Sequence, residues 1–253
     1  MVEIPLWLQA ALWGFVSGSA LILGALIAWF TTVRRQIIGI IMAFGSGVLI
    51  SALAFDLMDE AFKRGGFPAT AFGFLAGATL YSGVNYLLNR KGAKHRKRSG
   101  KQQSSETEAS GSGLAIALGS VLDGIPESIA IGVSMIEGSA VSIAAVIAIF
   151  LSNVPESLSS TSGMRQSGRS AKYVFGIWIA ITIMSSLASL AGYSIFRDFS
   201  PEVISATIAI AAGGILAMVS DTMIPEAFED SHDLTGIVTV GGFLAAFLLT
   251  KLS

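Results

Sequence analysis

The sequence has no cysteine, only two histidines and few charged side chains. Without cysteine it contains no disulfide, no thiolate metal site and no cysteine nucleophile. Charged residues account for 13% of the 253 positions and hydrophobic residues for 53%, and the mean hydropathy of +0.70 is too high for an ordinary soluble domain. We therefore expect the chain to lie in a lipid bilayer, with no nucleic-acid partner.

Long apolar runs recur along the whole chain. A helix needs about 20 residues to cross the hydrocarbon layer. Runs that meet this length are 6–30, 36–61, 68–89, 113–135, 139–163, 172–196, 202–229 and 233–252. The sequence therefore predicts an all-α integral membrane protein with eight transmembrane helices, forming a single transporter domain over residues 1–253.

Basic residues are distributed unevenly between the loops. If the N-terminus is outside, most Lys and Arg residues fall in inward-facing loops, and the positive-inside rule then places both termini outside a cell membrane, either plasma or inner. The stretch 90–112 is first basic and then rich in Gln, Ser, Glu and Gly, which predicts a disordered cytoplasmic linker. We interpret its basic residues as a topology anchor, with a lipid-surface contact or a metal-sensing loop as alternatives.

An internal repeat links the second and seventh spans. Residues 56–62 read DLMDEAF and residues 222–228 read TMIPEAF. Because these two spans run in opposite directions, the pattern predicts an inverted repeat of helices 1–3 and 6–8 around helices 4–5. Inverted repeats that flank a midplane site are typical of secondary transporters.

Two similar motifs place carboxylates and prolines deep inside adjacent spans. Residues 123–128 read DGIPES in the fourth span, and residues 152–157 read SNVPES in the fifth. Asp123 and Glu127 are four residues apart, so they share one face of a helix. Each proline leaves a backbone carbonyl without its usual donor, and irregular backbone at this depth either lines a cavity or is buried in protein. An oxygen-rich cavity of this kind suits a cation.

The four helices that carry most of the acidic residues contain no Lys or Arg. Their acidic residues are Asp56, Asp59, Glu60, Asp123, Glu127, Glu156, Asp221, Glu226 and Glu229. A carboxylate at the bilayer centre costs roughly 2.5–3.5 kcal/mol, so six unpaired ones would cost on the order of 15–20 kcal/mol. That exceeds the net stability of a typical protein. The sequence therefore predicts that protons neutralise these groups or that a cation binds among them, along an acidic ladder across the membrane.

With Pro-Glu motifs on the fourth and fifth of eight predicted helices, and a long loop between the third and fourth, the chain resembles the ZIP family of divalent-metal transporters. In that family the fourth-helix motif reads His-Asn-x-Pro-Glu-Gly, and its His and Glu bind metal together with the Glu of the fifth-helix motif. The resemblance implies that Glu127 and Glu156 are metal ligands and that Asp123 stands at the histidine position. Gly124 replaces the Asn of the motif, which weakens a second metal position.

The predicted metal ligands all offer oxygen. They are Asp123, Glu127, Ser152, Asn153, Glu156, Asp56, Glu60, Asp221 and Glu226. Oxygen ligands favour harder ions such as manganese, magnesium or calcium, whereas the family resemblance favours zinc, with manganese, iron or cadmium as alternatives. Zinc accepts carboxylate oxygen at about 2.0–2.2 Å. We expect the ion to be a substrate moved toward the cytoplasm, with no prosthetic group and no enzyme activity, and a homodimer is left open.

Two alternatives to a carrier remain. An intramembrane hydrolase of a lipid-phosphate type would combine the acids with the Arg/Ser/Gly loop 164–170, which we otherwise interpret as a positive-inside anchor. A metal sensor would bind the ion without moving it. His232 is expected to be a helix-cap neighbour rather than an inner metal ligand, and Trp178 to be an interfacial anchor or a lipid-facing residue.

Overall fold

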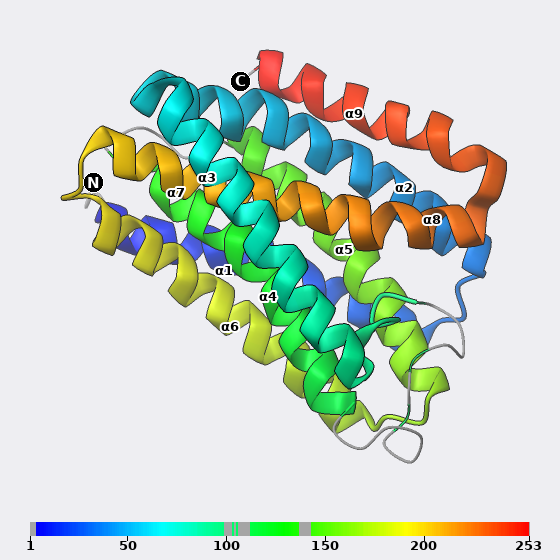
Figure 1. Cartoon of the computed structure of the whole chain (residues 1–253). Helices are drawn as coiled ribbons and strands as arrows, with labels where there is room; N and C mark the ends of the chain where they lie inside the picture. The colour runs from blue at the N-terminus through cyan, green and yellow to red at the C-terminus, as the bar shows by residue number, and fades with distance from the viewer. Residues whose placement is uncertain (1–3, 99–102, 104, 106–111, 137–142, 253) are drawn as a thin grey trace.

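The computed structural model describes residues 4–98, 103, 105, 112–136 and 143–252 (Figure 1). Within these residues the chain is all α-helical and contains no strand. The α-helices are α1 (Leu6–Phe30), α2 (Arg35–Ala52), α3 (Met58–Leu88), α4 (Ser112–Ser134), α5 (Ile143–Gln166), α6 (Ala171–Phe196), α7 (Pro201–Met218), α8 (Ile224–Ser231) and α9 (Thr235–Leu252). The predicted all-helical class is therefore confirmed.

Six helices or continuous helical runs of the described residues are long and apolar enough to cross a membrane. Four of them are single helices, and the other two are the runs Arg35–Ala93 and Pro201–Leu252. Each long run contains two of the predicted spans, which is why six runs are found where the sequence predicts eight spans. Each also contains a residue with positive φ, at Gly66 (φ 68°) and at His232 (φ 42°), where the helical path is interrupted.

Both long runs include a short π-helical turn that contains an aspartate. The turn η1 (Leu53–Leu57) precedes α3, and the turn η4 (Val219–Met223) precedes α8. When the two repeat segments of the sequence are aligned, these turns fall at corresponding positions. Pro225 explains the second turn, because its ring clashes with the carbonyl of Asp221, whereas no proline follows the first. Turns of this kind occur frequently at functional sites.

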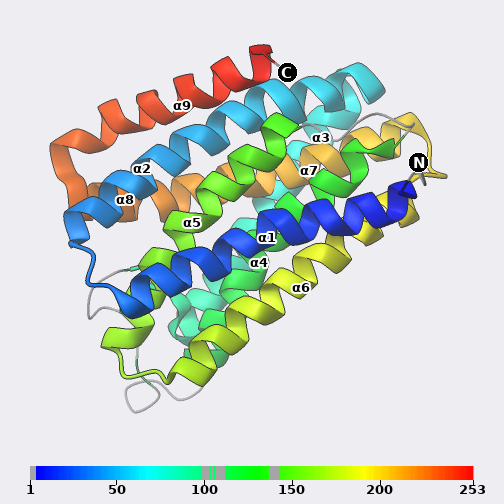
Figure 2. The ribbon, with the colours of Figure 1, turned by 180° about the vertical axis from the view of Figure 1, so that it is seen from behind.

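Small residues let the helices approach closely, as expected inside a membrane. At the α2–α9 contact a Cβ on Gly47 would overlap the Thr239 carbonyl oxygen, and at the α3–α7 contact a Cβ on Gly213 would overlap that of Phe74. The α2–α9 and α1–α6 pairs lie on opposite sides of the bundle, and α4 and α5 pass between them, as the two opposite views agree (Figures 1 and 2). The two motif-bearing helices are therefore the central ones.

Candidate cation site

Four carboxylates are buried in the centre of the bundle. Asp123 and Glu127 come from α4, Glu156 from α5 and Glu226 from α8, and none is more than 7% exposed. Glu127 is close enough to Glu156 and Asp123 to interact with both electrostatically. Glu226 is close enough to Asp123, Arg96 and Lys97 to interact with them electrostatically, so four of the predicted ligands from three different helices lie in one buried cluster.

A buried arginine holds Asp123 through both of its carboxylate oxygens. Arg96 donates from Nε to Asp123 Oδ2 at 3.0 Å and from Nη2 to Asp123 Oδ1 at 2.9 Å. Its Nη1 donates to Asn85 Oδ1 at 2.8 Å, and the Tyr81 hydroxyl donates to Asp123 Oδ1 at 2.6 Å. A bidentate pair of this kind is among the strongest polar contacts in proteins. Asp123 is therefore fully engaged by protein groups.

The next two residues of the chain make ion pairs with two more helices. Lys97 Nζ lies 3.0 Å from Glu156 Oε2 and 3.4 Å from Asp123 Oδ2, and Arg98 pairs with Glu229 of α8. Lys97 lies beyond the end of the spanning run Arg35–Ala93. Burial disfavours its charged form, but the charges of Asp123 and Glu156 outweigh this effect, so the pKa of Lys97 is raised.

Serines of α5 fix the backbone of these cations. The Ser160 hydroxyl donates to the Arg96 carbonyl at 2.6 Å, and the Ser159 hydroxyl donates to the Lys97 carbonyl. The Gln103 amide donates to the Arg96 carbonyl at 2.9 Å and to the Ser160 carbonyl at 3.0 Å. Residues 94–98, which we call the basic segment, are thus docked onto α5 by main-chain contacts as well as by charge.

The prediction that the buried acids lack basic partners is therefore wrong. The prediction takes into account only Lys and Arg residues on the same helices as the acids. Arg96 and Lys97 instead come from the loop that is predicted to be a disordered linker. Residues 90–97 of that loop are π-helical or turn, and Arg98 has no regular structure, whereas positions 99–102, 104 and 106–111 lie outside the described residues. Pairing with the buried carboxylates compensates for the desolvation of the two cations.

Two of the four acids keep an oxygen without a hydrogen-bond partner. Glu127 Oε1 and Glu226 Oε2 are both buried, and neither bonds to a group in the described part of the chain. A buried carboxylate in this state is costly unless a proton or a cation neutralises it. Arg96 and Lys97 thus satisfy Asp123 and Glu156, while Glu127 and Glu226 retain capacity for a further positive charge.

The two polar residues predicted beside the fifth-helix glutamate make other contacts. The Ser152 hydroxyl donates to the Ile149 carbonyl at 2.9 Å, and the Asn153 amide donates to the Ser17 carbonyl of α1 at 3.1 Å. Both side chains are buried in α5. These two hydrogen bonds stabilise α5 itself and its contact with α1.

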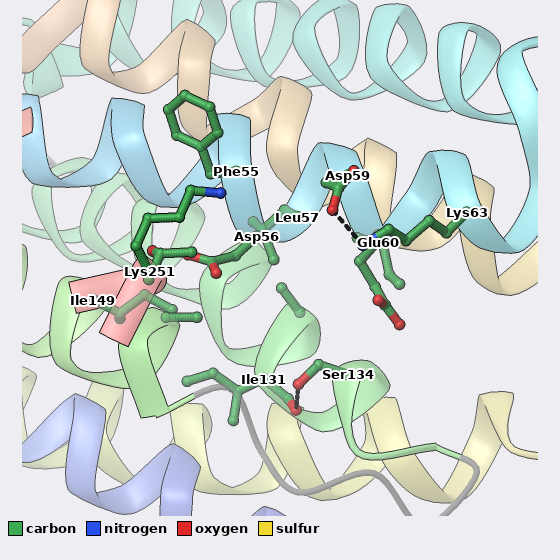
Figure 3. Close-up of a pocket in the computed structure, with 14 residues that line it drawn as sticks. Phe55, Asp56, Leu57, Asp59, Glu60, Lys63, Ile131, Ser134, Ile149 and Lys251 are labelled. Atoms are coloured by element: carbon green, nitrogen blue, oxygen red, sulfur yellow. Dashed lines mark hydrogen bonds and ion pairs between the residues drawn. The ribbon is translucent and has the colours of Figure 1, made fainter. Parts of the chain in front are cut away.

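The acids at the end of the predicted second span line a separate cavity of about 360 Å³ (Figure 3). Asp56 accepts a hydrogen bond from Thr250 at 3.2 Å, and Glu60 pairs with Arg64 at 2.5 Å. The cavity wall also includes Ala130 of α4, which lies three residues, or about one turn, from Glu127. Asp56 and Glu60 are therefore not in the buried cluster, although their cavity approaches it.

Other predicted residues lie away from the cluster. Asp221 is exposed and accepts a hydrogen bond from Ser82 at 3.3 Å. Trp178 is fully buried and donates to Thr161 at 2.7 Å, so the expectation of an interfacial or lipid-facing tryptophan is wrong. Arg165, which the hydrolase alternative would use, donates to the Trp29 carbonyl at the end of α1 at 2.8 Å.

The described residues do not form a complete metal-binding site in this conformation. No three His, Cys, Asp or Glu side chains among them are arranged to hold one ion together. Sequence reasoning missed Tyr81, Asn85, Arg96 and Lys97. A signal was present, because Tyr81 and Asn85 are two of the polar residues of a predicted span and, being four apart, share a face.

Comparison with models of known protein families gives no match for this chain. Comparison with curated protein sequences gives no match either. What the chain does therefore has to be inferred from its own residues and geometry.

Proposed function

We propose that this chain is a divalent-cation transporter that resembles the ZIP family and carries zinc or a similar ion toward the cytoplasm through its buried carboxylates. One observation carries the proposal. The charges of Asp123 and Glu156 are balanced by cations on a connecting segment, and not by residues of the helices that hold them. A balancing charge on a connection can leave while the helices stay packed, so it can be exchanged for a mobile ion.

Departure of the basic segment would leave an all-oxygen site. Asp123, Glu127, Glu156 and Glu226 would then lie buried without a counterion, which is unfavourable enough to make a divalent cation a strong ligand. Carboxylate oxygen accepts zinc and also harder ions such as manganese. In the described conformation Arg96 and Lys97 therefore stand where the positive charge of the transported ion would be needed, and the site is closed.

Two features support eight crossing helices arranged as an inverted repeat. The interruptions at Gly66 and His232 divide the two long runs into pieces that match the predicted spans. The π-helical turns η1 and η4 fall at corresponding positions of the two repeat segments. With eight crossings, the positive-inside rule places both termini outside and the basic segment on the cytoplasmic side.

The cavity at the other end of the bundle supports a path to the site. Its lining holds the carboxylates of Asp56, Asp59 and Glu60 beside the cations Lys63 and Lys251, and its wall reaches within one helical turn of Glu127. Buried Ile131 and Ile149 are also part of this wall. The basic segment closes the opposite side, where Arg98 also pairs with Glu229. We therefore propose a carrier that is open at this cavity and closed by the basic segment.

Uptake into proteoliposomes tests the proposal. Glu127→Gln and Glu156→Gln each remove one buried negative charge, and we expect each to lower the uptake of Zn²⁺ and of Mn²⁺ at least fivefold. Glu202→Gln, at an exposed position in the first turn of α7, is the matched control and should leave uptake unchanged. Uptake that is equal in the native chain and in both central variants would reject the carrier.

A further inference from the structure

Three carboxylates line the cavity of Figure 3, and two of them are paired with a cation of their own helix. Asp59 pairs with Lys63 at 2.6 Å, and Glu60 pairs with Arg64 at 2.5 Å, in both cases four residues further along α3. Asp56, in the turn η1, makes no ion pair of this kind among the residues that the structure describes. The charge of Asp56 is therefore not balanced from within its own helical run.

Two consecutive residues of α9 lie against this carboxylate. The Thr250 hydroxyl donates to Asp56 Oδ2 at 3.2 Å. Lys251 lines the same cavity and is close enough to Asp56 to interact with it electrostatically. Figure 3 shows the Lys251 side chain beside Asp56, with its ammonium near Phe55. The positive charge that acts on Asp56 thus comes from another part of the chain, as it does for Asp123 in the buried cluster.

Lys251 is held loosely, unlike the buried cations of the central cluster. Its Nζ lies 5.8 Å from the ring centre of Phe55 and 5.5 Å from that of Phe247, and these two rings contact each other with their centres 4.9 Å apart. Lys251 is exposed, and both cation–π contacts and ion pairs are weak at exposed positions. The ammonium can therefore move away from Asp56 without losing a strong contact.

We propose that Lys251 is a tethered counterion of Asp56 and controls the entry of cations into the cavity. This role rests on the proposed function, in which a divalent ion enters through the same cavity. While the ammonium stays beside the carboxylate, the two charges cancel and attract cations little, and when the ammonium turns out to water the carboxylate attracts them. A lysine in the last turn of a helix also stabilises the helix dipole, but that effect does not depend on Asp56.

Labelling of a single thiol in the cavity wall tests the pair. The chain has no cysteine, so Ser134→Cys places one thiol on the α4 side of this cavity. The measured quantity is the labelling rate with the cationic reagent trimethylammonium-ethyl methanethiosulfonate divided by the rate with neutral methyl methanethiosulfonate. We expect Lys251→Gln to raise this ratio about threefold and Asp56→Asn to lower it about threefold. The double variant should return the ratio to near its native value, because the two changes of charge cancel.

Two further variants separate charge from other effects. Lys251→Arg keeps the charge and should keep the native ratio. Arg197→Gln removes the same charge from an exposed position outside the cavity and should leave the ratio unchanged. In proteoliposomes, Lys251→Gln should lower the KM for Mn²⁺ uptake about threefold and leave the maximal rate unchanged.

The outcomes distinguish this role from the proposed function. A ratio that Lys251→Gln leaves unchanged, or shifts no more than Arg197→Gln does, would overturn the role of Lys251 even if the native chain takes up Mn²⁺. A double variant that falls below both single variants would show damage to the cavity and would also overturn it. If the native chain takes up no Mn²⁺ while the ratios shift as expected, the proposed function is rejected and the counterion pair is retained.

Discussion

Replacing Arg96 and Lys97 together by alanine is expected to raise the apparent affinity for Mn²⁺ or Zn²⁺ about 100-fold. Each hydrogen bond to a charged group contributes about 1.5–3 kcal/mol, and with the lower value for each of the two ion pairs the docked segment is favoured by about 3 kcal/mol. A site that is closed to this extent is available in only about one molecule in a hundred, and apparent affinity falls by the same factor. Removing the two side chains removes this competition and leaves the acids, of which no three in the described residues are arranged to hold one ion, free to move around it.

Calorimetric titration of the purified chain and proteoliposome uptake at low ion concentration both measure this effect. Arg34→Ala/Arg35→Ala removes the same net charge from two exposed positions at the start of α2 and should change neither result. Binding and uptake that are as weak in the Arg96/Lys97 variant as in the native chain would show that the basic segment does not compete with an ion. Loss of folding in the variant is recognised separately, from its elution profile and its helical content.

Replacing Asp123 by alanine is expected to lower the stability of the folded bundle by about 3 kcal/mol. Removing one partner of a buried ion pair typically costs about 3–5 kcal/mol, because the other charge stays uncompensated. Release of the basic segment into solvent limits this loss, since Arg96 then escapes burial. Tyr81→Phe removes a single hydroxyl from the same group and should cost only about 0.5–1.5 kcal/mol.

A double-mutant cycle separates this charge effect from simple damage to α4. Arg96→Ala in the Asp123→Ala background removes the cation that has lost its partner. The double variant should therefore lose less stability than the sum of the two single losses. Reversible unfolding in mixed detergent measures all four proteins. Strict additivity, or a loss below about 1 kcal/mol for Asp123→Ala, would contradict the role given to the pair.

Much of the architecture could be predicted from the sequence, because the length of an apolar run depends only on consecutive residues and not on contacts with distant parts of the chain. The spans predicted at 6–30 and 172–196 agree with α1 and α6 to within one residue. The motifs at 123–128 and 152–157 were expected to place carboxylates near each other, and Asp123 and Glu156 do share Lys97. Proline positions and carboxylate spacing were sufficient for that part of the site.

The partners of those carboxylates could not be predicted in the same way, because they come from a distant part of the chain. Arg96 is polar, lies in a stretch of low complexity and has no helical periodicity that would reveal its contact with Asp123. Composition indicates that such a stretch cannot form its own core, but not that it can enter an existing one. Close packing adds a second hidden constraint, since a Cβ on Gly119 would lie 2.5 Å from Arg96 Cδ.

The accessibility of one buried position tests the central claim most directly. The chain has no cysteine, so Ser160→Cys introduces a single thiol beneath the basic segment, where Ser160 is 1% exposed and contacts the Arg96 carbonyl. If a divalent ion displaces the segment, Mn²⁺ should increase the rate of maleimide labelling at least tenfold over Na⁺ at equal ionic strength. This increase should vanish when Glu127→Gln and Glu156→Gln are added. If saturating Mn²⁺ leaves the labelling rate unchanged, the proposal that a divalent ion replaces Arg96 and Lys97 is contradicted.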